Sequence, residues 1–168
     1  MKKILTIILI LTTALATFAG PCAFKLAEDK FSGASAIDEW RNVGSGVLYT
    51  PFWQETTPNA PGYVALLFVY IGNDWLFLES TKFLIGGKDI VTPETTQIPR
   101  KVLSDARVSE GLVVTGDAFI AALAAQTTPV DVRLSGESSA DIILSPHLLE
   151  DLRCFLHKAD STVGCRQR

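Results

Sequence analysis

Two long apolar stretches in the middle of the chain are typical of buried strands. Residues 63–71 read YVALLFVYI and residues 75–85 read WLFLESTKFLI, with a short GND turn between them. Their aromatic and β-branched side chains favour strands over helices. Gly86 and Gly87 are typical of a tight hairpin turn, and residues 88–92 follow as a third short strand. The pattern therefore predicts a three-stranded antiparallel meander over residues 63–92.

The segments that flank the meander are β-rich but less regular. Residues 47–55, VLYTPFWQE, contain Pro51. Because proline lacks a backbone donor, we predict an edge strand there. Residues 56–62 and the polar stretch 93–101 are predicted to be loops. Short β-like segments are expected at 101–103 and 107–114.

The last third of the chain predicts two helices and a hairpin. Residues 116–126 place their larger apolar side chains on one side of a short helix. Residues 130–135, VDVRLS, alternate as a half-buried strand does, and ADIILS pairs back after a turn. Ser145 and Pro146 are a strong start signal for a final helix. Its predicted apolar stripe comprises Leu148, Leu149, Leu152, Phe155 and Leu156.

The order of these elements predicts the fold class. Strands, a helix, a hairpin and a second helix follow one another without alternating βαβ units. This order is typical of an α+β fold. We expect an antiparallel meander sheet of about five to six strands, with two helices packed on one face.

The N-terminus has the pattern of a bacterial export signal. Lys2 and Lys3 precede an uncharged, mostly apolar run from Ile4 to Phe24 that ends in small residues. Cleavage after Ala19 is favoured, and a retained membrane anchor is the alternative. We divide the chain into a signal peptide at 1–19, a loosely structured arm at 20–43 and a single α+β domain at 44–168. Helical turns are expected within the arm at 25–30 and 36–41, and the expected location is the periplasm or the exterior.

Charge narrows the classes of partner. Loss of Lys2 and Lys3 with the leader takes the basic total from 15 to 13, against 18 acidic residues, so the net charge moves from −3 to −5. A mildly acidic surface argues against nucleic acid and anionic membrane as partners. Neither the pair Gly44 and Gly46 nor the pair Gly86 and Gly87 has the lysine and helix context of a phosphate-binding loop, and we expect no cofactor.

The three cysteines are Cys22, Cys154 and Cys165. In an oxidising compartment two of them normally pair. Cys154 lies on the polar side of the last helix, and Cys165 follows a flexible ADSTVG segment, so a Cys154–Cys165 disulfide is favoured. Pairing of Cys22 with either of them is the alternative. Lipidation of Cys22 is disfavoured because Pro21 immediately before it fits a processing junction poorly.

Catalytic and metal-binding patterns are weak in this sequence. Ser138 in GESSA loosely matches a serine-nucleophile motif but lies between two predicted strands rather than between a strand and a helix. A hydrolase would combine it with His147 and Asp141 or Asp151. Acidic pairs drawn from Asp74, Glu79, Asp89 and Glu94 have no feature that selects two of them. Cys154 and His157 lack the paired spacing of zinc sites, so no metal is expected.

Aromatic side chains give the more suggestive pattern. Tyr49, Phe52 and Trp53 lie in the predicted edge segment, and Tyr63 begins the meander. If exposed, these four residues would form a binding patch, with Tyr49 and Trp53 its main members. The sequence favours a non-catalytic, exported binding module whose partner is another protein or envelope component. A small envelope hydrolase and a membrane-tethered accessory lipoprotein are the alternatives, and membrane contact is expected only if Cys22 is lipidated or the leader is retained.

Overall fold

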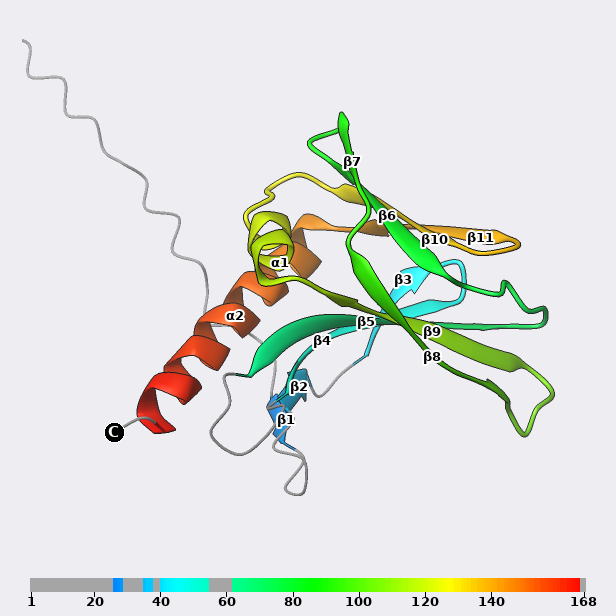
Figure 1. The fold of residues 1–168 in the computed structure, drawn as a ribbon, viewed down its shortest axis with the longest axis horizontal. Coiled ribbons are helices and arrows are strands. Elements are labelled where there is room, and N and C mark those ends of the chain that lie inside the picture. The colour runs from blue at the N-terminus through cyan, green and yellow to red at the C-terminus, as the bar shows by residue number, and fades with distance from the viewer. Residues whose placement is uncertain (1–25, 29–34, 38–39, 55–61, 167–168) are drawn as a thin grey trace, which may run out of the picture.

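The computed structural model describes residues 26–28, 35–37, 40–54 and 62–166. Its strands form two antiparallel sheets that, with two helices, enclose one apolar core (Figure 1). The predicted α+β class is confirmed, with the strands shared between two sheets. The expected signal peptide and Cys22 lie outside the described residues.

The larger sheet has seven strands. They run in the order β1-β2-β4-β5-β9-β8, and β3 also pairs with β4. One face of this sheet points into the core, through side chains such as Tyr49, Phe68 and Leu112. The strands are β1 (Leu26–Glu28), β2 (Ser35–Ile37), β3 (Arg41–Gly44), β4 (Val47–Gln54), β5 (Tyr63–Gly72), β8 (Glu94–Val102) and β9 (Val108–Thr115).

The smaller sheet has the order β11-β10-β6-β7. It is built from two hairpins, and both were predicted. Gly86 and Gly87 turn β6 into β7 with φ of 60° and 71°, a region that favours glycine. The turn after Ser135 joins β10 to β11. The strands are β6 (Ser80–Ile85), β7 (Asp89–Val91), β10 (Val130–Ser135) and β11 (Ser139–Leu144).

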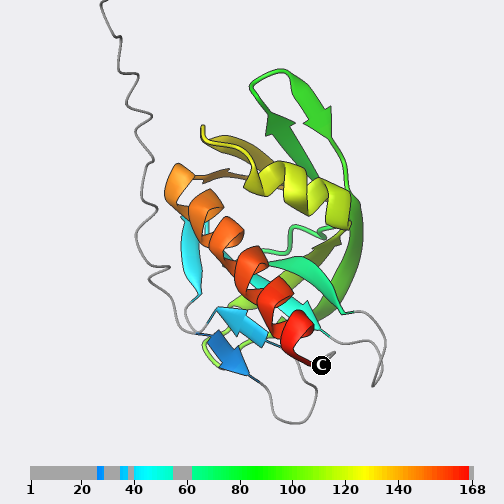
Figure 2. The same cartoon turned by 90° about the vertical axis from the view of Figure 1, so that its left-hand side faces the viewer.

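Two helices, α1 (Asp117–Ala124) and α2 (Pro146–Arg166), lie on the same side of the molecule and contact each other (Figure 2). The Ser145 hydroxyl accepts a hydrogen bond from the Leu148 amide at 3.4 Å, which confirms the predicted N-terminal cap of α2. Arg153 on α2 donates to the carbonyls of Ala124 and Gln126 at 2.7 and 3.0 Å, and so holds the end of α1.

The predicted meander is only partly correct. β5 pairs with β4 and β9 in the larger sheet, whereas β6 pairs with β7 and β10 in the smaller one. The two strands are therefore not partners. The segment between them is not the start of a strand, because Phe77 has a φ of 53°. The buried Glu110 carboxylate holds this segment by accepting from the amides of Leu76 and Leu78.

Three other local predictions are wrong: the loop at 93–101 and the helical turns at 25–30 and 36–41. The stretch 93–101 is largely strand β8 rather than a loop. In place of the expected helical turns, the described part of the arm contains strands β1, β2 and β3, which join the larger sheet through β4. These corrections share a cause, because short or polar strands carry no strong apolar period and are recognised only through their partners.

The segment 47–55 contains an interior strand, so its prediction as a sheet edge is wrong. β4 pairs with β5 along its whole length and with β3 and β2 on its other side. β3 is paired with residues 47–49 of β4 and β2 with residues 52 and 53. Pro51 falls between those two ladders, where neither β3 nor β2 needs a donor from β4. This position explains how an interior strand accommodates a proline.

Candidate functional site

The open face of the smaller sheet forms a hollow of about 500 Å³. Alternate side chains of its strands point into the core, including Phe83, Val132 and Ile142. The intervening side chains therefore line the opposite face. We call this face the sheet groove and define it by Lys82, Leu84, Ile90, Asp131, Arg133, Asp141 and Ile143.

Three aliphatic side chains, Ile143, Leu84 and Ile90, form a row across the sheet groove that Asp131 interrupts, and we call these three the apolar row. The strand register aligns Ile143 with Asp131, Asp131 with Leu84, and Leu84 with Ile90. Ile90 is 70% exposed and Ile143 is 54% exposed. Two large aliphatic side chains thus face solvent at the two edges of one concave surface. Aliphatic side chains gathered on one concave face, rather than scattered singly, are a feature of contact surfaces.

A row of charges lies beside the apolar row. Asp141, Arg133 and Lys82 are aligned on β11, β10 and β6. Arg133 donates to both carboxylate oxygens of Asp141 at 2.6 and 2.7 Å. These hydrogen bonds lower the pKa of Asp141 and raise that of Arg133. With Asp131, the groove contains two acidic and two basic side chains, so its charges balance.

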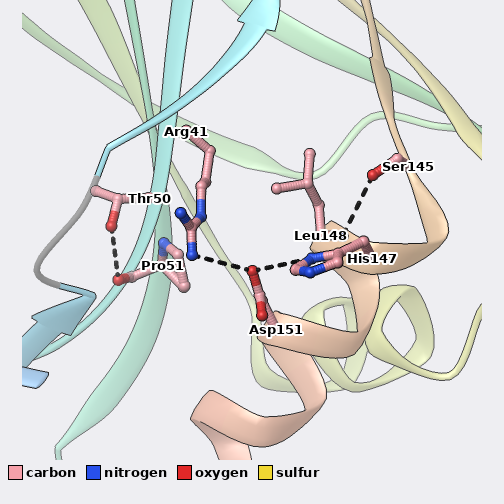
Figure 3. Close-up of polar contacts among 7 residues, drawn as sticks. All are labelled: Arg41, Thr50, Pro51, Ser145, His147, Leu148 and Asp151. Carbon is pink, nitrogen blue, oxygen red and sulfur yellow. Dashed lines mark hydrogen bonds and ion pairs between the residues drawn. The ribbon is translucent and has the colours of Figure 1, made fainter. Parts of the chain in front are cut away.

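A second polar cluster joins α2 to β3 (Figure 3). The Asp151 carboxylate is largely buried, and its Oδ2 lies 3.5 Å from Arg41 Nη2 and 3.4 Å from His147 Nδ1. Burial, and then the charge of Asp151, raise the pKa of the Tyr49 phenol well above its usual range. Asp151 and His147 belong to α2, whereas Arg41 belongs to β3 and Tyr49 to β4. The cluster therefore fixes α2 against β3 and β4.

The hydrolase alternative would need Ser138 beside His147. Ser138 lies in the turn before β11, and His147 lies in the first turn of α2 after β11. The six residues of β11 separate them by about 20 Å at about 3.3 Å per residue. Asp141 is already paired with Arg133, and the His147 side chain is 73% exposed. The structure does not bring the three groups together.

The aromatic residues predicted for binding point to two different faces. Tyr49 and Trp53 are 1% and 6% exposed, so their predicted exposure is wrong. Their side chains share the core-facing side of β4, because every second residue of a strand points the same way. Phe52 faces the other side of the sheet with Tyr63, at 6.5 Å between ring centroids, and both are partly exposed. Phe52 and Tyr63 are thus the two that a partner can reach.

The remaining predicted positions form no site in the described part of the chain. Asp74, Glu79, Asp89 and Glu94 are exposed. Among all the residues that the structure describes, no group of three metal-binding side chains comes together. Cys154 and Cys165 both lie on α2, Cys154 half-buried and eleven residues before Cys165.

The sheet groove was not predicted, although one signal for it exists in the sequence. In ADIIL, strict alternation requires a polar side chain at position 143, yet Ile143 is found there. This apolar residue on the solvent side of an amphipathic strand departs from the expected alternation and is the sequence signal for the groove. The concavity of the groove has no such signal, since it depends on the pairing of β6, β7, β10 and β11.

Comparison with known proteins finds no matching protein-family model, curated protein or solved structure. Among the described helices, neither is both long and apolar enough to cross a membrane.

Proposed function

We propose that the protein is an exported, non-catalytic binding module of the bacterial envelope, and that its sheet groove holds an extended segment of a partner protein. The observation that carries the proposal is the exposure of Ile90 and Ile143 on one concave face of about 500 Å³. That volume is within the usual range of ligand sites. The leader pattern, with Lys2 and Lys3 before an apolar run, supports export.

The spacing of the apolar row suits an extended segment that crosses the strands. Neighbouring strands are about 4.8 Å apart, so Leu84 is about 10 Å from Ile143 and Ile90 is about 14 Å from it. An extended chain repeats its side chains on one face about every 7 Å. Two or three apolar side chains of such a segment would meet the row, while its polar groups face Arg133, Asp141 and Lys82.

The balanced charges of the groove favour a protein over a charged polymer. Lys82 and Arg133 offset Asp131 and Asp141, so the groove has no net field to attract nucleic acid or a polycation. The separation of Ser138 from His147 supports a binding role over the hydrolase alternative.

Selection from a displayed library of random short peptides tests the proposal. We expect enriched peptides with apolar residues at alternate positions, and at least a tenfold loss of affinity in Ile90→Lys and Ile143→Lys, which is about 1.4 kcal/mol. Val102→Lys is the matched control, because Val102 is a 69% exposed aliphatic residue outside the groove. Peptides that bind all three variants equally, or no enrichment, would reject the groove as the binding surface.

A further inference from the structure

Cys154 is one half of a disulfide bond in this structure. The chain has only two other cysteines, Cys22 and Cys165. The partner of Cys154 is therefore one of these two in any intramolecular bond. The geometry of α2 decides between them.

Cys165 is out of reach of Cys154. Both residues belong to α2, which runs without interruption from Pro146 to Arg166. Eleven residues of helix separate their Cα atoms by about 16 Å at about 1.5 Å per residue. The Cα atoms of a disulfide are about 4.4–6.8 Å apart. A Cys154–Cys165 bond would require about three turns of α2 to unwind.

The direction of Cys154 around α2 also points to the N-terminal part of the chain. On a helical wheel at about 100° per residue, Cys154 is about 20° from His147 and about 60° from Asp151. Asp151 contacts Arg41 of β3 on that flank of α2. The opposite flank faces α1, since Arg153 reaches the carbonyls of Ala124 and Gln126 there.

The connection from Cys22 to the sheet is short. Cys22 precedes the first residue of β1, Leu26, by four positions, and an extended chain covers about 14 Å over that length. β1 is two strands away from β4, or about 10 Å, and α2 packs against β4. The length of about 14 Å that the chain can span from Cys22 to Leu26 is thus similar to the separation of about 10 Å between β1 and β4.

We propose that Cys22 and Cys154 form a disulfide that fastens the N-terminal segment to the flank of α2. In its formation the two thiols lose two protons and two electrons, and the sulfurs join. A disulfide-bearing oxidant protein of the export compartment accepts the electrons and becomes a dithiol. Because the Cys22 sulfur is then in a disulfide, it cannot carry a lipid thioether, and the lipoprotein alternative is excluded.

Peptide mapping of the exported full-length protein, with thiols alkylated at lysis and no reductant, tests this pairing. Trypsin places the three cysteines in separate peptides: one that ends at Lys25, CFLHK at 154–158, and ADSTVGCR at 159–166. We expect the first two to be linked and the third to be alkylated. A link between CFLHK and ADSTVGCR, alkylated Cys154, or an acyl mass on Cys22 would overturn the proposal.

Serine variants give a second, independent readout. Unfolded without reductant, the wild-type protein and Cys165→Ser are expected to contain one and zero reactive thiols respectively. Cys22→Ser is expected to contain two, because it releases Cys154. Two reactive thiols in Cys165→Ser with none in Cys22→Ser would instead indicate a Cys154–Cys165 bond and reject the proposal.

Discussion

Asp151 of α2 lies 3.5 Å from Arg41 of β3 and connects the last helix to one of the first strands of the sheet. The side chains are 9% and 26% exposed respectively. Replacement of Arg41 by methionine would leave a largely buried carboxylate without its guanidinium partner. We expect the free energy of unfolding to fall by about 3 kcal/mol, measured by urea unfolding.

Two comparisons isolate this effect. In the double variant Arg41→Met/Asp151→Leu no charge is left buried, and we expect it to recover much of the loss. Arg107→Met breaks the exposed Arg107–Asp105 pair, whose side chains are 51% and 49% exposed, and is expected to cost less than about 1 kcal/mol. Equal losses in Arg41→Met and Arg107→Met would show that burial of Asp151 has no energetic role.

Glu110 supports the irregular segment before β6. Its carboxylate accepts from the amides of Leu76 and Leu78, and Arg100 Nε lies 3.4 Å from it. Glu110→Ala would remove the acceptor of two backbone donors, so we expect a loss of about 3 kcal/mol in urea unfolding. Faster hydrogen exchange at the Leu78 amide should accompany it.

Glu110→Gln is the matched variant. The amide oxygen can still accept one of the two hydrogen bonds, so we expect a loss smaller than that of Glu110→Ala. Unchanged exchange at Leu78 in Glu110→Ala would contradict the role assigned to the carboxylate.

Gly136 is required by close approach of two backbones. A Cβ atom there would lie 2.1 Å from the Phe77 carbonyl oxygen and 2.5 Å from that of Leu76. Backbone atoms cannot move aside as a flexible side chain does, so we expect Gly136→Ala to cost about 3 kcal/mol by thermal or urea unfolding.

Gly87→Ala is the control for Gly136→Ala. Gly87 has a φ of +71° but no atom within 4 Å of an added Cβ. Left-handed backbone alone costs about 1 kcal/mol, so the Gly87 variant should be the more stable of the two. The reverse order would argue against the close approach at Phe77.

Stability should depend on pH through Asp141. Its pKa is lowered from 3.8 by the hydrogen bonds and charge of Arg133. A depressed folded-state pKa stabilises the fold above the unfolded-state value, and this contribution is lost as the pH falls through the folded-state value. We therefore expect the urea midpoint of Asp141→Asn to be below that of the wild type at neutral pH. The difference should shrink as the pH falls below the unfolded-state pKa of about 3.9 and through the lower folded-state pKa.

The effect should be small, because both side chains are exposed, and salt should reduce it. Asp131→Asn, on the same face, is the comparison variant. A difference for Asp141→Asn that persists unchanged to low pH would show that the Arg133 pair is not its source.

Local patterns predicted the two hairpins of the smaller sheet and the helices α1 and α2 correctly. Gly86 and Gly87, the alternation in VDVRLS and the pair Ser145-Pro146 each specify a turn, a strand or a cap within a few residues. No local signal assigns β5 and β6 to different sheets, since that depends on which distant strands they meet. The role of Glu110 did have a signal in the sequence. It is a charged residue between Val108 and Leu112 on the core-facing side of β9, where an apolar side chain is expected.

The binding residues illustrate a different limit. β4 is apolar on both faces, with Tyr49 and Trp53 on one and Leu48 and Phe52 on the other. Alternation then shows which side chains share a face, but not which face is buried. The choice of Tyr49 and Trp53 as exposed residues was wrong for this reason.

The division of the ladder at Pro51 has a consequence for motion. β2 is joined to β4 by only two register pairs, Ser35 with Trp53 and Ala36 with Phe52, and β1 is joined only to β2 among the described strands. The hairpin β1–β2 can therefore detach while β3 and the rest of the sheet stay paired. Local opening on the timescale of hydrogen exchange should begin there, well before the core strands β5 and β9 exchange their amides.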